Sequence, residues 1–484
     1  MPPPMIAPMP TAADLMPLLP EMVLVGAAFV LLMLDLFLDE GRRIVTHAGA
    51  VVALVVVAAM VVGGVGGDGT TLGGMFVRDT AADVLKVAVL VTSALSMLYL
   101  WPFLRARELY RGEVAVLVLF ATVGMMLLVS SGSLVMVYLG LEMVALCSYA
   151  LVAIDRDSAL ASESAIKYFV LGSLASGLLL YGMSLVYGAT GSLDLSRIAS
   201  VIADGQGGTM LLTGVVFMLA GVAFKFGGAP FHMWLPDVYT GAPTPITQFI
   251  GSAPKLASFG MAYRLFEVGA GGLDEKWRLL FAVVAVASLA IGNLGAMVQS
   301  NLKRMLAYST VSHVGFLFMG IAGGGAQGFA AAMFYAISYA LMAVAAFGMI
   351  VVMSSRGFEA DLIDDYKGLN ARHPWLAGLV LCVMASLAGL PPFLGFWAKL
   401  AVLRAALDGG MMWLALVGVV FAVVGAFYYL RVVKAMYFDT ADSDAQPVVS
   451  SRPLRIVFAV NALGLLALGL AWSPVMAWCQ RAFA

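Results

Sequence analysis

Two stretches decide the fold: LAGVAFKFGGAPFHMWLPDV at 219–238 and MASLAGLPPFLGFWAKL at 384–400. Each begins as an apolar helix and meets glycine and proline in mid-run, where proline removes a backbone donor and clashes with the preceding turn. Each also carries a lysine beside the interruption, Lys225 and Lys399. Broken helices persist in a membrane only where they line a cavity or are buried in protein. The two stretches therefore predict a membrane protein with a polar interior.

The composition agrees with a membrane location and excludes several function classes. Of the 484 residues, 62% are hydrophobic and only 11% charged, whereas a soluble domain carries about 25% charged residues. The net charge near zero leaves no basic surface for nucleic acid. The three cysteines are far apart, without metal-ligand spacing, and no phosphate loop or dinucleotide motif is present. We expect no nucleic-acid partner, and no cofactor or metal in this chain.

The apolar runs predict an all-α integral membrane fold of about fourteen transmembrane helices. The first run lacks the positively charged region of a cleaved signal peptide and is expected to be retained. Loops after odd-numbered helices carry the larger share of lysine and arginine, which predicts a bacterial-type inner membrane with both termini on the non-cytoplasmic side. The candidate spans are 18–38, 44–65, 81–101, 113–130, 132–152, 162–188, 209–240, 244–268, 277–298, 303–321, 326–352, 376–407, 411–438 and 456–477.

The two interrupted helices also predict internal symmetry. They are the seventh and the twelfth of the series, and each has proline–phenylalanine at the break with tryptophan a few residues later. This is the pattern of a transporter built from two inverted five-helix repeats. We expect an N-terminal three-helix segment at 1–112, repeats at 113–268 (helices 4–8) and 277–438 (helices 9–13), and a C-terminal loop and helix at 439–484.

Four ionisable residues fall near the middle of their spans: Glu142, Lys225, Lys255 and Lys399. An unpaired charge at a helix centre costs about 2.5 to 3.5 kcal/mol on insertion scales, so these groups must pair or face internal water. One static ion pair would use the glutamate and one lysine, and the other two lysines would have no acidic partner in the middle of the membrane. We therefore favour a proton relay, in which a neighbouring charge changes the proton affinity of each site. The alternative is a set of packing pairs that only lock the helices together.

Other polar residues carry weaker expectations. His232 and His313 are candidate proton shuttles near neutral pH, although a histidine hydrogen-bonded within a helix bundle is nearly as common. Lys86 and Lys167 lie close to helix ends, and we expect both to extend toward the headgroups. Lys167 is kept as a further relay candidate.

Three segments carry a family resemblance: FKFGGAPFHMWLPDVYTGAPTPITQFIGSAPK (224–255), NLKRMLAYSTVSHVGF (301–316) and GLPPFLGFWAKL (389–400). They resemble the antiporter-like membrane subunits of respiratory complex I, the proton-pumping NADH:quinone oxidoreductase. Within that family, PDVYTGAPTPIT (236–247) is in the style of the N branch, whereas the M and L branches usually read PDAH followed by APT. Lysine rather than glutamate at position 399 argues against M, and the lack of a long lateral helix after the last span argues against L.

The resemblance implies roles for the midplane charges. Glu142 and Lys225 would form a switchable pair, Lys255 the central relay site and Lys399 the group that exchanges protons with the far side. The partners would be other membrane-arm subunits, including other antiporter-like ones, and the lipid bilayer. The FMN, iron–sulfur clusters and quinone of such a complex would be used elsewhere in the assembly. Two alternatives are a subunit of a multisubunit cation/proton antiporter, which shares the fold, and a non-transporting membrane scaffold.

Overall fold

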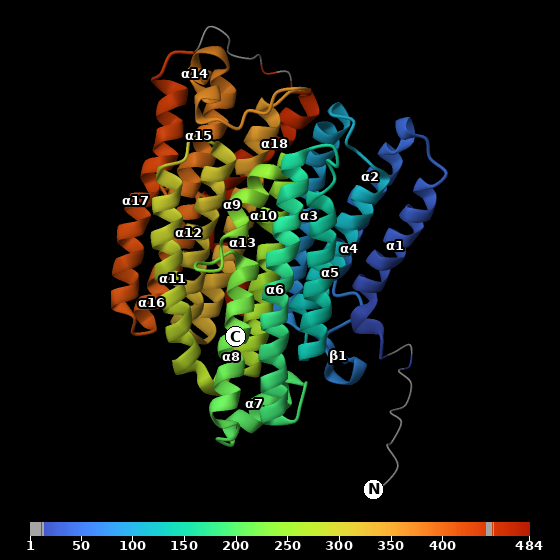
Figure 1. Cartoon of the computed structure of the whole chain (residues 1–484), viewed down its shortest axis with the longest axis vertical. Helices are drawn as coiled ribbons and strands as arrows, with labels where there is room; N and C mark the ends of the chain where they lie inside the picture. Colours follow the sequence, from blue (N-terminus) through green and yellow to red (C-terminus); the bar gives the residue numbers. More distant parts are fainter. Residues whose placement is uncertain (1–10, 12–13, 442–447, 449) are drawn as a thin grey trace.

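The computed structural model describes residues 11, 14–441, 448 and 450–484 of the chain. Most helices run side by side along the long axis of the molecule (Figure 1). In chain order the helices and strands are α1 (Leu19–Asp35), α2 (Ile44–Val62), β1 (Gly69–Thr71), β2 (Phe76–Arg78), α3 (Thr80–Ala106), α4 (Gly112–Val129), α5 (Leu134–Val152), α6 (Ala159–Thr190), α7 (Leu195–Ala203), α8 (Gly208–Phe226), α9 (Trp234–Gly241), α10 (Thr244–Ala262), α11 (Asp274–Met297), α12 (Leu302–Gly323), α13 (Gly325–Met353), α14 (Leu369–Arg372), α15 (Pro374–Ala388), α16 (Leu394–Asp408), α17 (Met412–Tyr437), α18 (Arg452–Leu470) and α19 (Ser473–Arg481).

Twelve helices in the described part of the chain are long and apolar enough to cross a membrane. The protein is therefore a multi-pass, essentially all-α membrane protein, as the hydropathy pattern predicts. The expected count of about fourteen would add α10 and the pair α15–α16 to these twelve, and it stays a prediction. The expected segment boundaries at 113–268 and 277–438 likewise stay predictions.

Both predicted helix breaks are confirmed. Helix α8 ends at Phe226, Gly227 takes a left-handed φ of +77°, and helical structure resumes at Trp234 with α9. Helix α15 ends at Ala388, Gly389 takes a φ of +83°, and α16 resumes at Leu394. A left-handed residue closes a helix C-terminus and is nearly always glycine, because a Cβ is disfavoured there. The sequence thus encodes a helix stop at each break.

The backbone groups released at the breaks find partners inside the protein. At the first break, the Ser288 hydroxyl of α11 accepts a hydrogen bond from the Ala229 N–H at 2.9 Å. The Trp234 indole donates to the Phe224 carbonyl at 3.0 Å. At the second break, the Ser386 hydroxyl accepts from the Gly395 N–H at 3.3 Å. Each of these contacts gives a backbone group freed at a break a partner inside the protein, as a helix break at membrane depth requires.

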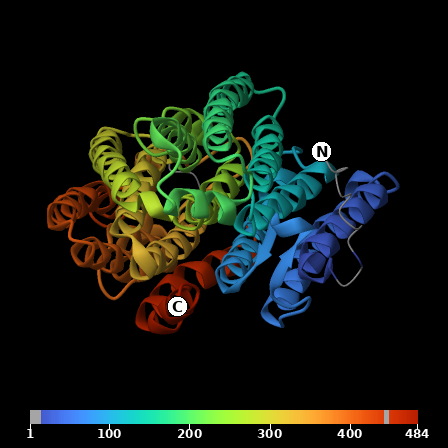
Figure 2. The ribbon, with the colours of Figure 1, turned by 90° about the horizontal axis from the view of Figure 1, so that it is seen from below.

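Helix α10 lies at the centre of the molecule. Every residue from Thr244 to Ala262 is buried, including Gln248, Ser252 and Lys255, and the helix packs against α13 and α3. Figure 2 shows α1 and α2 at one edge of the assembly and α17 near the opposite edge. Because α10 faces protein on all sides, it tolerates polar residues that a lipid-facing helix would exclude.

Three short elements were not predicted. The antiparallel hairpin β1–β2 joins α2 to α3. Helix α7 lies across the end of the molecule below α8, opposite the end that carries α14 (Figure 1). Helix α19 follows α18. All three are too short or too polar to register as apolar spans, and α7 buries only one face. We call the end that carries α14 the α14 face.

The expectation for Lys86 is wrong. Its side chain is 0% exposed, and its ammonium lies 2.8 Å from the Glu21 carboxylate of α1, which is also buried. The ring of Phe76, from the unpredicted hairpin, lies 4.8 Å from the ammonium. Because the hairpin and α1 cover this end of α3, Lys86 pairs inside the protein instead of extending to the headgroups.

Candidate functional site

Glu142 and Lys225 meet at a small cavity beside the first break. Glu142 comes from the middle of α5 and Lys225 from the last turn of α8, and Ser176 of α6 donates a hydrogen bond to the Glu142 carboxylate. The cavity that these side chains line measures about 20 Å³, which is room for about one water molecule. Among the described residues, the two charged groups make no direct ion pair, although the charge of Glu142 acts on Lys225. The geometry suits an interaction through water.

Lys255 reaches from α10 to the end of the first half-helix. Its ammonium donates to the Phe226 carbonyl at 2.7 Å and to the Lys225 carbonyl at 3.4 Å. The ring of Trp234 lies 5.2 Å away, within cation–π range. The side chain is 1% exposed. A cation at the carbonyl end of a helix is stabilised by the helix dipole, so the break creates the binding site for this ammonium.

Lys399 repeats this arrangement at the second break. From α16, its ammonium donates to the carbonyls of Leu387 and Ala388 at 3.1 and 2.8 Å. The ring of Phe316 on α12 lies 5.3 Å away. The side chain is 7% exposed. Each break therefore holds one buried lysine against the last carbonyls of its first half-helix.

His313 lies in a hydroxyl network next to Lys399. Its Nδ1 hydrogen-bonds the Tyr335 hydroxyl of α13 at 2.6 Å, and its Nε2 hydrogen-bonds the Tyr429 hydroxyl of α17 at 3.0 Å. Nearby, the Tyr339 hydroxyl donates to Thr310 at 2.8 Å. The imidazole is fully buried, and the charge of Lys399 acts on it. His313 is thus in a position to pass protons between hydroxyl groups on three helices.

His232 and Lys167 lie apart from this network. His232 is half-buried in the first break, its Nδ1 has no hydrogen-bond partner in the described structure, and its ring lies 6.4 Å from that of Tyr308. Lys167 is half-exposed and pairs with Glu163 and Asp237 at 2.8 and 2.9 Å. A relay role for either residue stays a prediction.

The sequence did not predict the hydroxyl-bearing residues around His313, nor a further buried lysine, Lys303. Lys303 is the first residue of the predicted span 303–321, a position where the sequence gives no sign of burial, but its side chain is 2% exposed. The hydroxyl network was marked only by the local pattern YSTVSH at 308–313, which places several hydroxyls and one histidine within two turns of α12. Tyr335, Tyr339 and Tyr429 gave no local signal, because an apolar helix carries tyrosine for packing as readily as for hydrogen bonding.

Lys255 and Lys399, the two lysines at the helix-end carbonyls, are titratable ammoniums in the protein interior, and each can bind or release a proton without a metal or an organic cofactor. Among the described residues, no group of three or more His, Cys, Asp or Glu side chains is placed to hold a metal ion. The lysines also have a simpler role, because each satisfies carbonyls that the helix breaks leave free. Relay and capping both require a buried lysine at these positions.

Residues 131–425 match the family model described as NADH:quinone oxidoreductase/Mrp antiporter, TM. This region includes both helix breaks and all four midplane charges, and the chain belongs to this family of membrane subunits.

Relatives identify a branch within the family. The chain is 65% identical to NADH-quinone oxidoreductase subunit N of Xanthomonas euvesicatoria over 481 residues, which cover 99% of each chain. It is 48% identical to the protein of the same name from Thiobacillus denitrificans over 472 residues, or 96% of this chain and 97% of that one. The predicted resemblance to the N branch is confirmed.

Solved structures show the same fold. A chain of respiratory complex I from Thermus thermophilus with bound aureothin is 30% identical, with a TM-score of 0.81 over 95% of this chain and 98% of that one. A chain of the Mrp complex from Dietzia sp. has a TM-score of 0.84 at 22% identity, over 98% and 97% of the two chains. The second likeness shows the fold alone.

Proposed function

We propose that this chain is a proton-translocating membrane-arm subunit of NADH:quinone oxidoreductase, with Glu142, Lys225, Lys255 and Lys399 as its relay. The observation that carries the proposal is the pair of buried lysines, Lys255 and Lys399, that bind the helix-end carbonyls at the two breaks, in a chain whose relatives are named as subunit N of that enzyme. Quinone reduction, with the FMN and iron–sulfur clusters that serve it, takes place in other subunits.

In this relay the proton moves by changes in electrostatic interaction. Lys225 and Lys255 lie close together at the first break, so protonation of one raises the free energy of the proton on the other. Glu142 stabilises the charged form of Lys225, and movement of either group away from the shared cavity weakens that effect. A proton leaving Lys255 passes through the hydroxyl groups around His313 to Lys399, which releases it on the far side.

The proposal also includes the arrangement of the helices in the membrane. Fourteen membrane helices, arranged as an N-terminal three-helix segment, two inverted five-helix repeats and a last helix, place both breaks at related positions of their repeats. Both termini then lie on the non-cytoplasmic side of a bacterial inner membrane. Other membrane-arm subunits, including antiporter-like ones, are the partners.

A subunit of a cation/proton antiporter is the second candidate, because the Mrp chain shares the fold. The relatives at 65% and 48% identity are all named as subunit N, which favours the oxidoreductase. A scaffold role is less well supported, because a scaffold has no need for two buried ammoniums beside broken helices.

The test uses Lys225→Ala in the assembled complex, reconstituted into vesicles and supplied with NADH and a quinone. We expect the complex to assemble but to lose most proton pumping and most coupled quinone reductase activity. Lys225→Arg should be milder because it keeps a cation opposite Glu142. Lys276→Ala, which removes an exposed lysine of α11, is the matched control. Full coupled activity in assembled Lys225→Ala would reject the proposal.

A further inference from the structure

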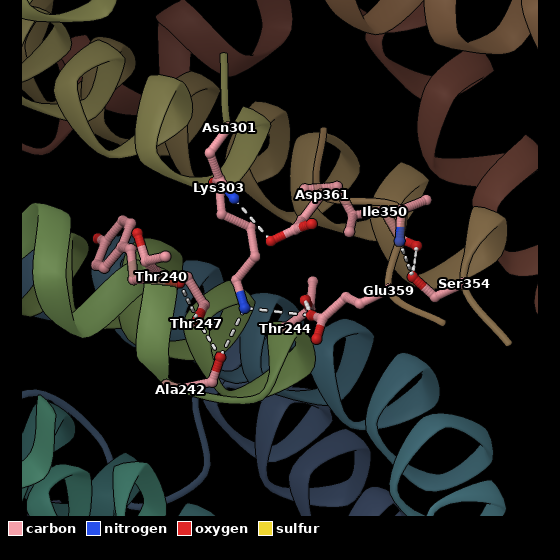
Figure 3. A network of polar contacts seen from close by, with 12 residues as sticks. Thr240, Ala242, Thr244, Thr247, Asn301, Lys303, Ile350, Ser354, Glu359 and Asp361 are labelled. Atoms are coloured by element: carbon pink, nitrogen blue, oxygen red, sulfur yellow. Dashed lines mark hydrogen bonds and ion pairs between the residues drawn. The ribbon is translucent and has the colours of Figure 1, made fainter. Parts of the chain in front are cut away.

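A third buried lysine caps a half-helix at the α14 face. The Lys303 ammonium, in the first turn of α12, donates to the Ala242 carbonyl at the end of α9 at 2.8 Å. It also contacts the Glu359 carboxylate at 3.2 Å. Figure 3 shows Lys303 reaching from α12 between the α9 end and the Glu359 loop. Neither residue belongs to the relay described above.

Glu359 connects this buried ammonium to the surface. Its side chain is 33% exposed, whereas that of Lys303 is 2% exposed. Thr244 of α10 donates a hydrogen bond to the same carboxylate. Burial alone would raise the pKa of Glu359, but Lys303, the Thr244 hydrogen bond and Arg107 outweigh burial and hold the pKa below its ordinary value. A carboxylate with a lowered pKa binds a proton from water only weakly.

The loop that carries Glu359 is held firmly in place. Arg107 donates to the Ser355 and Phe358 carbonyls at 2.8 and 3.1 Å. Asn301 donates to the Asp361 carboxylate at 2.7 Å, an interaction also visible in Figure 3. The position of Glu359 over Lys303 is thus fixed by neighbouring contacts on both sides.

A column of buried polar groups leads inward from Lys303. The Thr247 hydroxyl contacts the Ala242 and Tyr239 carbonyls at 3.4 and 3.1 Å. The Tyr239 side chain is 0% exposed, and its hydroxyl faces Thr310 but makes no hydrogen bond within the described structure. Thr310 accepts from Tyr339, whose ring lies 5.0 Å from that of His313.

Two further buried atoms on these helices make no hydrogen bond within the described part of the chain: Gln248 Oε1 of α10 and Ser338 Oγ of α13. Buried polar atoms of this kind are usually satisfied by internal water. Hydroxyl groups and water both donate and accept hydrogen bonds, so they can conduct a proton without changing their own charge. The column therefore has the composition that a proton path requires.

We propose that Glu359 and Lys303 form a proton-entry site on the α14 face, and that the hydroxyl column through Tyr239 carries the proton to His313. The inference rests on the proposed function, because it supplies protons to the relay. A proton from water adds to the Glu359 carboxylate, which weakens the hold of that carboxylate on Lys303. The proton then leaves toward Thr247, and Glu359 returns to its ionised form. Internal water carries the proton from Thr247 to the Tyr239 hydroxyl. Tyr239, Thr310 and Tyr339 each release their own hydroxyl proton as they accept the incoming one, and the imidazole of His313 takes up the last proton.

Glu359→Gln tests the entry site in the assembled complex in vesicles. The glutamine carbonyl still accepts the Thr244 hydrogen bond, but the amide does not bind and release a proton near neutral pH, so we expect a several-fold loss of pumping. Asp364→Asn is the matched control, because it removes a carboxylate charge a few residues later in the chain, at a side chain that is 69% exposed and lies outside the column. Glu359→Asp should restore much of the rate.

The pH profile separates proton entry from a structural role. The charged groups facing Glu359 are Lys303 of α12 and Arg107 after α3. If proton supply limits the Glu359→Gln variant, its loss deepens as the pH rises on the uptake side. A packing defect lowers the rate equally at every pH, and that result would overturn the proposal.

Tyr239→Phe tests the middle of the column by removing one hydroxyl, with Tyr99→Phe as the control at a buried tyrosine between α3 and α18. We expect a several-fold loss of pumping for the first variant and none for the second.

If Glu359→Gln fails to assemble, Thr247→Val tests the same path. Normal pumping in the column variants while Lys255→Ala is inactive would reject the entry site alone. Normal pumping in Lys255→Ala as well would reject the proposed function.

Discussion

Breaking the buried ion pair of Glu21 and Lys86 should cause a large loss of stability. The two side chains are 3% and 0% exposed and lie 2.8 Å apart, so solvent and salt screen them little. Glu21→Gln leaves the Lys86 ammonium inside the protein with no acid of its own. Removing one partner of a buried ion pair costs about 3 to 5 kcal/mol, and we expect a loss of that size in the free energy of unfolding.

The double variant Glu21→Leu with Lys86→Met should recover most of this loss. Replacing both members of a buried pair with apolar residues of similar volume is often neutral or stabilising. The external control is Glu108→Gln, because the Glu108–Arg356 pair is 73% and 72% exposed and such pairs contribute at most about 1 kcal/mol.

Equilibrium unfolding of the purified chain in mixed detergent micelles, followed by loss of helicity, measures all of these variants. The reasoning is refuted if Glu21→Gln is no less stable than Glu108→Gln. It is also refuted if the double variant loses the sum of the two single losses, because the two residues would then act independently.

Two further predictions follow from local geometry. A Cβ on Gly182 of α6 would lie 2.7 Å from the Gly214 carbonyl oxygen of α8, whereas a Cβ on Gly177 of the same helix would meet nothing within 4 Å. Gly182→Ala should therefore lower the free energy of unfolding by about 1 to 3 kcal/mol in the same assay. Gly177→Ala, its control, should be neutral or slightly stabilising. Burial alone would raise the pKa of Asp194, but hydrogen bonds from Ser196 and Arg197 at the start of α7 hold it below its ordinary value. The stability that ionised Asp194 gives to α7 is present above the unfolded pKa of about 3.9 and is lost as the pH falls through the folded pKa. The backbone amides of α7 should therefore exchange with solvent faster on acidification. Asp194→Asn should remove this pH dependence.

The helix breaks could be predicted because their cause is local. Glycine and proline within an apolar run determine where α8 and α15 end, whatever the rest of the chain does. The four midplane charges could be found for a similar reason, since a charged residue inside an apolar run is visible without knowledge of its neighbours. The lysine contacts with the carbonyls of Phe226 and Ala388 could not, because they depend on how α10 and α16 pack against the broken helices.

The predictions failed mainly for charged side chains near helix ends, which the structure buries. Lys86 and Lys303 both lie in the first two turns of their helices, where the sequence gives exposure as the default. The structure buries them under elements that are distant in sequence or too short to predict: α1 and the hairpin over Lys86, the α9 end and the Glu359 loop over Lys303. A hydropathy pattern describes each helix separately and does not report which of its ends is covered.

The central claim is that the lysines at the breaks carry protons and do not only cap helices. Proton pumping by the assembled complex with Lys399→Arg tests it most directly. Arginine keeps the cation that the Leu387 and Ala388 carbonyls bind, but it does not give up its proton in proteins. The relay predicts an assembled complex with strongly reduced proton translocation per NADH oxidised, or strongly reduced turnover. Translocation and turnover equal to those of the unmodified complex would contradict the relay and leave helix capping as the role of Lys399.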